Sequence, residues 1–178
     1  MSSNIQRPAT TDYAQAFGPY VGLVPEADIL GVLDNQSQEV ADLTSNISAE
    51  QAAFRYAPDK WSIREVMGHL ADSERVFGFR AMALARGERA ELPGFEENEY
   101  VDHGDFDDWS LSDLVAQFQS LRSSNVQLFK HLSDDAWKRS GIVNGNSITV
   151  PSLAWIIAGH LRHHIGILNE RYLSKLAG

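Results

Sequence analysis

The chain has 178 residues, of which 15 are Lys or Arg and 24 are Asp or Glu, giving a net charge of −9. This length predicts one domain with a substantial core. The negative charge argues against a nucleic-acid-binding surface, which needs clustered basic residues, and no stretch approaches the roughly 20 apolar residues of a membrane span. The absence of cysteine excludes disulfides, thiolate metal ligands and a cysteine nucleophile, and it fits the reducing cytoplasm, where we expect the protein.

The first 24 residues are predicted to be an N-terminal arm that precedes the folded domain, residues 25–178. The arm begins with MSSNIQRPATTDY, which lacks the apolar stretch of a signal peptide, and we expect it to be flexible. The following residues predict a helix over about 25–47, with Pro25 in its first turn, because apolar positions recur at steps of three and four. The stripe consists of Ile29, Leu33, Gln36, Val40, Leu43 and Ile47.

A second helix is predicted over about residues 62–86. Ser62 is a suitable N-cap and Glu65 follows three positions later, which is the pattern of a capping box. Gly87 is a suitable residue to end this helix. The connection that follows, residues 87–110, is acidic and rich in aromatic residues and has no helical period. A connection of this length in a compact domain is usually functional or a crossover.

Two more helices are predicted over about residues 110–132 and 151–175. Ser110 suits the start of the third helix, and Pro151 suits the first turn of the fourth. Between them, Asn144-Gly145 lies between two short runs of β-forming residues, which indicates a small hairpin. Four amphipathic helices that each need a partner for their apolar stripe predict an all-α fold, an antiparallel four-helix bundle.

Three of the six histidines lie in the segment GHLRHH, residues 159–164, on the fourth predicted helix. His160 shares a face with both His163 and His164, because residues three and four positions apart stack on one side of a helix. The apolar stripe predicts that this face is buried, where an unpaired imidazole costs about 1–3 kcal/mol. A metal ion would satisfy two such rings at once, although a hydrogen bond to a carbonyl is the commoner fate of a histidine on an apolar face.

His69, in the middle of the second predicted helix, is the candidate for a third metal ligand. Helix bundles bring side chains from facing helices together in such sites. His103, in the acidic connection, and His131, late in the third helix, are expected at the surface.

The segment WSIREVMGHLADSE, from Trp61 to Glu74, together with the later HxxxH of His160 and His164, resembles the DinB-like superfamily and its YfiT-like branch. The resemblance implies a four-helix bundle that holds one divalent metal ion between three histidines. Carried onto this chain, the ligands are His69, His160 and His164, which leaves His163 as a neighbour. Members are often dimeric, which makes a homodimer a candidate assembly, although the sequence leaves the oligomeric state open.

Three neutral imidazoles leave room for water or substrate, which is typical of catalytic rather than structural metal sites. Such ligands suit zinc, nickel or iron. The resemblance implies a small-molecule substrate and favours a transferase that uses a low-molecular-weight thiol, supplied from outside because the chain has no cysteine. The alternatives are a metal-dependent hydrolase and a non-catalytic, metal-stabilised binding protein.

Three further residues are candidates for positions beside the metal or the substrate: Glu74, Arg80 and His163. Glu74 is five positions from His69, and the favoured interpretation is an ion pair with Arg75, Arg80 or the fourth helix. Arg80 is interpreted either as a surface residue or as a contact for an anionic substrate. The acidic connection is expected over the end of the bundle nearest the metal. Its aromatic residues are Phe95, Tyr100, Phe106 and Trp109, which are candidates to line the mouth of a pocket.

Overall fold

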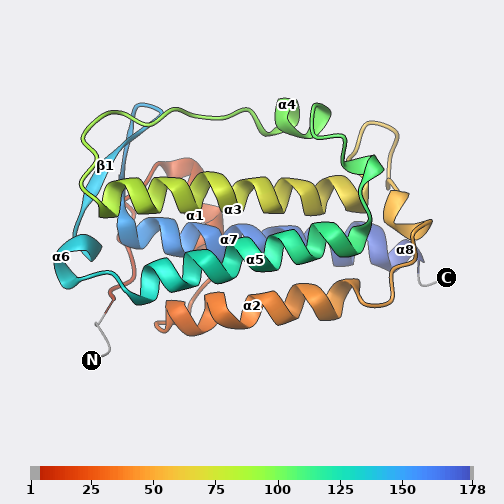
Figure 1. Ribbon diagram of the computed structural model, residues 1–178, viewed down its shortest axis with the longest axis horizontal. Coiled ribbons are helices and arrows are strands. Elements are labelled where there is room, and N and C mark those ends of the chain that lie inside the picture. The colour runs from red at the N-terminus through yellow and green to blue at the C-terminus, as the bar shows by residue number, and fades with distance from the viewer. Residues whose placement is uncertain (1–4, 177–178) are drawn as a thin grey trace.

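Four long helices form a bundle in the computed structural model, which describes residues 5–176. They are α2 (Ile29–Thr44), α3 (Ile63–Ala85), α5 (Leu111–Lys130) and α7 (Val150–Ile167) (Figure 1). Each of them packs against two others, α3 and α2 both contacting α5 and α7. The helical bundle predicted from the sequence is confirmed. Within residues 5–176, no helix is both long enough and apolar enough to cross a membrane.

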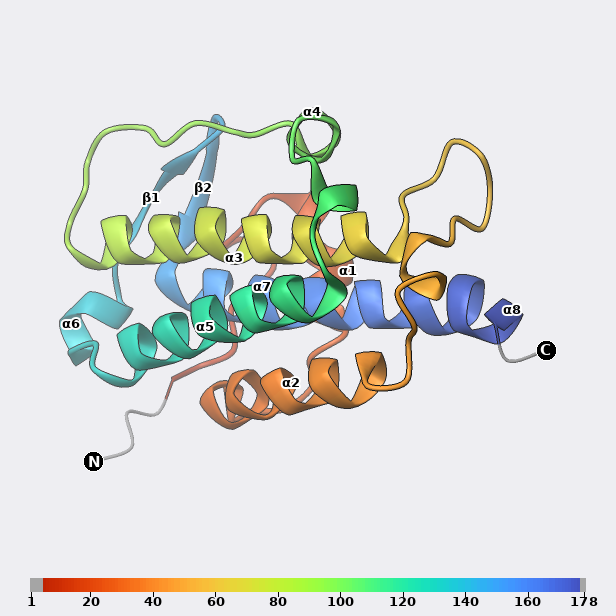
Figure 2. The same ribbon diagram turned by 45° about the vertical axis from the view of Figure 1, so that its right-hand side comes forward.

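The helix directions explain the long acidic connection. The chain colours show that α2 and α7 run one way and α3 and α5 the other (Figure 1). The neighbours α3 and α5 are therefore parallel, and the chain must return along the whole of α3, about 34 Å for 23 residues, before α5 begins. The connection runs along the flank of α3, on the side away from α2 (Figure 2). Its expected position over the end of the bundle is therefore wrong.

Short elements lie in this connection, in other links between the long helices and near the chain ends. The connection contains α4 (Glu97–Asp102) and a 3₁₀ turn, Phe106–Asp108. The other short elements are α1 (Gly18–Gly22), α6 (Asp134–Trp137), α8 (Ser174–Leu176), the 3₁₀ turns Gln15–Phe17 and Gln51–Ala53, and a π-helical turn, Leu168–Leu173. The fourth predicted helix thus continues past α7 through a π-helical turn.

Side-chain caps set the starts of the long helices. The Ser62 side chain accepts from the Glu65 backbone N–H while the Glu65 carboxylate accepts from Ser62, so the predicted capping box is confirmed. Ser110 likewise caps α5. The predicted start of the first helix at Pro25 is wrong, because the Asp28 side chain accepts from the Gly31 backbone N–H and caps α2 there.

Helix α1 packs against α7 at very short range. A Cβ at Gly159 would lie 1.9 Å from the Tyr20 carbonyl oxygen, so only glycine lets the two backbones approach this closely. Val21 and Val24 are buried in the core beside α7. The segment that was expected to be a flexible arm therefore contributes a helix and core side chains next to His160.

The small β-hairpin lies at one end of the bundle, beside the C-terminal end of α3 (Figure 1). Strands β1 (Ser140–Val143) and β2 (Asn146–Thr149) pair antiparallel, with Val143 opposite Asn146. The two turn residues, Asn144 and Gly145, have φ of 48° and 73°, which is the left-handed geometry of an Asn-Gly hairpin turn. The predicted hairpin is confirmed, and Leu92 of the acidic connection pairs with Val143 beside it.

A buried polar network joins all four long helices. The Arg122 guanidinium on α5 is fully buried and pairs with the Glu74 carboxylate on α3, with Nη2 2.6 Å from Oε1. Arg122 also donates to the Gln36 side chain on α2. Gln36 donates in turn to the carbonyl of Ala158 on α7 at 2.9 Å, and Asn125 donates to Glu74 at 2.9 Å. The network fixes α7 relative to α3 two residues before His160.

Candidate metal centre

The three histidines singled out from the sequence meet in the core between α3 and α7. His69 Nε2 lies 3.0 Å from His160 Nε2, and His164 Nε2 lies 3.2 Å from the same atom. One ring nitrogen from each histidine lies within 4.8 Å of the other two, and all three side chains are buried. In a tetrahedral site with metal–nitrogen bonds of 2.0–2.1 Å, nitrogen ligands stand about 3.3 Å apart. The two short separations in the cluster are close to this spacing.

The three clustered imidazole nitrogens suit a metal cation better than they suit hydrogen bonds to one another. His160 Nε2 has two imidazole neighbours, yet a neutral ring nitrogen carries either one proton or one lone pair. It can therefore donate to one neighbour or accept from both through a single lone pair, and neither arrangement gives two good hydrogen bonds. His164 Nδ1 is also buried with no partner among the described residues. A divalent metal ion at this point would use all three Nε2 lone pairs.

Aromatic rings enclose the cluster. Tyr20 of α1 lies edge-on to His160 at 5.3 Å between ring centroids, and Phe77 of α3 lies 5.8 Å from His160. Trp61, just before α3, lies 4.9 Å from His69. These rings keep the imidazoles apart from bulk water and restrict their orientations.

Burial keeps these imidazoles neutral. It lowers the pKa of His69 to about 4, with a further contribution from the nearby His163. Burial also takes the pKa of His160 well below the usual histidine value, with further electrostatic contributions from His164 and His69. The pKa of His164 is lowered in the same way, by burial and then by His69 and His163. Neutral imidazole is the form that binds metal ions.

The lowered pKa values predict acid sensitivity of the metal-free protein. A histidine with a folded pKa below its unfolded value of 6.5 stabilises the fold fully above pH 6.5, and this stability is lost as the pH falls towards the folded value. Between pH 6 and 5, each histidine kept neutral should lower the free energy of unfolding by about 1.2 kcal/mol. Urea unfolding at several pH values measures this slope.

His131→Gln is the control for this titration, because His131 is exposed. It should leave the slope unchanged, whereas His69→Gln should reduce it. A free energy of unfolding that stays flat between pH 6.5 and 5 in the metal-free wild type would contradict the argument.

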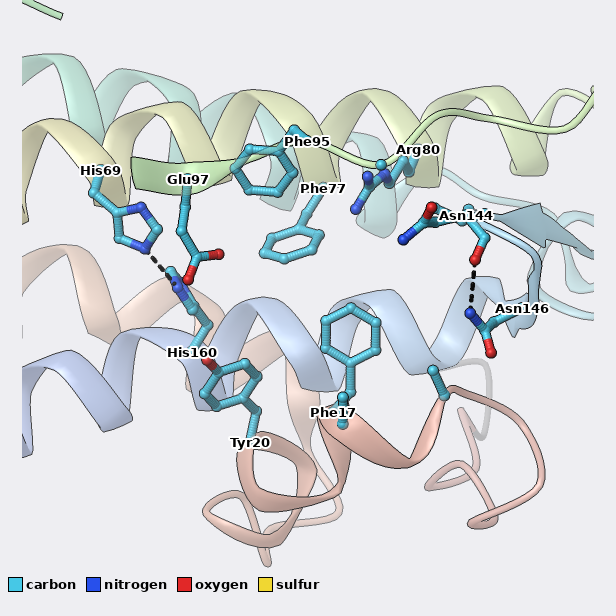
Figure 3. Close-up of a pocket in the computed structure, with 14 residues that line it drawn as sticks. Phe17, Tyr20, His69, Phe77, Arg80, Phe95, Glu97, Asn144, Asn146 and His160 are labelled. Atoms are coloured by element: carbon cyan, nitrogen blue, oxygen red, sulfur yellow. Dashed lines mark hydrogen bonds between the residues drawn. The ribbon is translucent and has the colours of Figure 1, made fainter. Parts of the chain in front are cut away.

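A cavity of about 310 Å³ opens from the cluster along α3 (Figure 3). Its polar side chains gather at two ends. His69, His160, Tyr20 and Glu97 lie at one end, and Arg80, Asn144 and Asn146 lie at the other. Between them the walls are the rings of Phe17, Phe77 and Phe95 (Figure 3). The volume is in the range of small-molecule sites, which are mostly apolar with a few placed polar groups.

A second depression, of about 190 Å³, reaches the cluster from the side of His164. Its lining includes Tyr56, Lys60, Trp61 and Tyr172. The three histidines thus stand between two openings.

The other predicted positions have the following places. Glu74 pairs with Arg122 of α5 and with none of the partners that were expected for it. Arg80 is 5% exposed and lines the cavity, so its interpretation as a surface residue is wrong. The His163 ring is half-buried between Tyr20 and His164, at 5.3 and 5.1 Å between centroids. His103 and His131 are exposed, as predicted.

The aromatic residues of the connection have separate places. Phe95 lines the cavity. Tyr100 is largely exposed beside Phe95, and Trp109 is also exposed. Phe106 is buried against Gly68, where a Cβ would come within 2.4 Å of its ring.

Two side chains at the metal end were not found from the sequence. Tyr20 lies in the segment expected to be a flexible arm, and Glu97 was one of many carboxylates in the connection. No local pattern marks either residue, because both are placed by the packing of segments far from α3 and α7.

Comparison with known proteins agrees with this architecture. The sequence model that describes the DinB superfamily matches residues 33–168, three quarters of the chain and all three clustered histidines. The chain belongs to the DinB superfamily. A relative from Oceanobacillus iheyensis, named "Putative metal-dependent hydrolase", is 20% identical over 75% of this chain and 77% of its own length.

Two solved structures share the DinB-superfamily fold. YfiT from Bacillus subtilis, described as "a probable metal-dependent hydrolase with an unusual four-helix bundle topology", has a TM-score of 0.73 at 22% identity, over 80% of this chain and 82% of YfiT. The mycothiol-dependent maleylpyruvate isomerase has a TM-score of 0.66 at 11% identity, over 82% of this chain and 61% of the isomerase. At these identities the likeness shows the fold alone.

Proposed function

We propose that this DinB-superfamily protein is a metal-dependent hydrolase of a small molecule bound in the cavity beside His69 and His160. The observation that carries the proposal is the convergence of three neutral, buried imidazole nitrogens, with His69 and His160 of this cluster lining one end of that cavity. Three protein ligands leave a tetrahedral metal ion with an open position. The names of the Oceanobacillus iheyensis relative and of YfiT support hydrolysis over the thiol-dependent transfer that the family resemblance favoured.

His69, His160 and His164 would hold the ion, for which zinc, nickel and iron are the candidates. When bound, such an ion lowers the pKa of a coordinated water towards ~7 and polarises a carbonyl group. The protein's own groups supply the rest. The aromatic walls exclude bulk water and orient an apolar substrate. Glu97, whose carboxylate points towards His160 in Figure 3, is placed to accept the proton that the attacking water releases.

Thiol-dependent transfer is the second candidate, and the second depression favours it. A reaction between two organic molecules needs two approaches to one centre, and the three histidines lie between two openings. The thiol would have to come from a small molecule, because the chain has no cysteine.

Turnover assays on protein of measured metal content test the proposal. We expect hydrolysis of some members of a panel of 4-nitrophenyl esters and 4-nitroanilides without any thiol. This activity should be lost on chelation and restored by adding zinc, nickel or iron(II).

Two other outcomes would overturn the proposal. Turnover that requires a low-molecular-weight thiol and an electrophile would favour the second candidate. A protein that turns over neither the esters and anilides nor a thiol with an electrophile, and whose melting temperature falls on chelation, would be a non-catalytic, metal-stabilised binding protein.

A further inference from the structure

Arg80 stands on the same face of α3 as His69, at the opposite end of the cavity. Eleven residues separate the two positions, which at 100° per residue places them within about 20° of each other around the helix. The same spacing separates their Cα atoms by about 16 Å along the axis. Arg80 therefore faces the cavity three turns away from the three histidines (Figure 3).

The Arg80 guanidinium is buried without a counter-ion. Its side chain is 5% exposed, and it donates one hydrogen bond, from Nη2 to the Pro93 carbonyl at 2.8 Å. It forms no ion pair with a carboxylate in residues 5–176. The guanidinium also lies over the faces of Phe77 and Phe95, with each ring centroid 5.6 Å from the guanidinium carbon.

Comparison with Arg122 shows what this environment lacks. Arg122 is completely buried, but it has the Glu74 carboxylate and the Gln36 side-chain oxygen as partners. Buried charges in proteins are normally paired, because removing an ion from water is costly unless a counter-charge and hydrogen bonds replace the water. Apart from the bond from Nη2 to Pro93, the N–H groups of the Arg80 guanidinium have no protein acceptor among the described residues, and the side chain lines the cavity.

The surrounding groups point to an anion with one negative charge. Asn144 and Asn146, from the hairpin, line the same end and add amide groups. Among residues 5–176, Glu97 is the only carboxylate that lines the cavity, and it lies at the histidine end (Figure 3). Its charge disfavours a second negative group there. The middle of the cavity is aromatic, so the part of the ligand between the two ends should be apolar.

We propose that Arg80 binds the carboxylate of the substrate, which is an aryl or alkyl carboxylic acid that spans the cavity. A planar guanidinium matches a carboxylate through paired N–H donors. The remote carboxylate fixes the register of the apolar chain, and the reacting group is held at the three histidines. The position of the reacting group at the histidines rests on the proposed function, whereas binding of the carboxylate to Arg80 does not.

Binding of 4-phenylbutanoate and of its neutral isostere 4-phenylbutanamide tests this proposal. Isothermal titration on the protein as purified, with its metal content measured, gives the ratio of the two dissociation constants. We expect the acid to bind at least about tenfold more tightly, because a hydrogen bond to a charged group contributes more than a neutral one. Arg80→Gln should bring the ratio close to one.

Arg89→Gln is the matched control, because it removes the same charge from an exposed position in the connection. It should leave the ratio unchanged. Equal binding of the acid and the amide to the wild type would overturn the proposal even if Arg80→Gln does not fold. Preference for the acid that persists in folded Arg80→Gln would also overturn it, since the carboxylate would then bind elsewhere.

Repeating the titration after chelation separates this proposal from the proposed function. A preference for the acid that survives in metal-free protein supports the role of Arg80 even where no hydrolysis is found. A preference that disappears with the metal, in protein that remains folded, contradicts it and places the carboxylate at the histidine end.

Discussion

Alanine at His69, His160 or His164 should remove most of the bound metal, whereas His163→Ala should leave it in place. The three ring nitrogens lie within 4.8 Å of one another, and the His163 ring lies beside this cluster. Loss of a hydrogen-bonding partner behind a metal ligand typically weakens metal binding about 10–100-fold. Loss of one of three ligands should exceed this. Metal stoichiometry by elemental analysis, with affinity from competition against a chelator, measures the effect.

His163→Ala is a demanding control, because His163 shares its helix with two of the proposed ligands and contacts both Tyr20 and His164. Circular dichroism should show that all four variants keep their helical content before their metal content is compared. If His163→Ala empties the site while His164→Ala remains filled, the ligand assignment is wrong. If the wild-type protein binds no divalent ion at any metal concentration, the proposed hydrolase function has no basis.

The choice between His163 and His164 marks the limit of what helical spacing predicts. Both residues share a face with His160, three and four positions away, so a helix considered alone fits either. The third histidine decides between them, because His69 lies on α3 and packs beside His160 and His164. The pair could be chosen in advance only through the family resemblance, which carries tertiary information that the spacing does not.

The helices themselves were predictable because their signals are local. Ser62, Glu65 and Ser110 act on backbone groups within three residues, and an apolar stripe requires a partner whichever helix supplies it. The contact of Tyr20 with α7 has no such signal. It depends on Gly159, 139 positions later, where the absence of a Cβ lets α1 approach the backbone of α7. The parallel arrangement of α3 and α5 is also non-local, although the length of the acidic connection agrees with it.

The buried pair of Glu74 and Arg122 should have the largest effect on stability. Arg122→Met leaves the Glu74 carboxylate buried without its counter-ion, and removing one partner of such a pair costs about 3–5 kcal/mol. Glu74→Leu should cost a similar amount, because it leaves the guanidinium unpaired. Urea unfolding of both variants at pH 7 measures the loss.

The exposed pair of Lys130 and Asp34 joins the same α5 to α2, so Lys130→Met is the matched control. It should change the free energy of unfolding by less than about 1 kcal/mol.

The double variant Glu74→Leu/Arg122→Met distinguishes the cost of an unpaired charge from the loss of packing. Replacing a buried ion pair by apolar side chains of similar volume is often neutral or stabilising, so the double variant should be more stable than either single variant. Gln36 and Asn125 would each lose a partner, which should keep it below the wild type. Gln36 should still hold the Ala158 carbonyl, two residues before His160, so the double variant should retain its metal. Single variants whose losses simply add in the double variant would contradict the ion-pair account and would mean that each side chain stabilises the bundle through its packing alone.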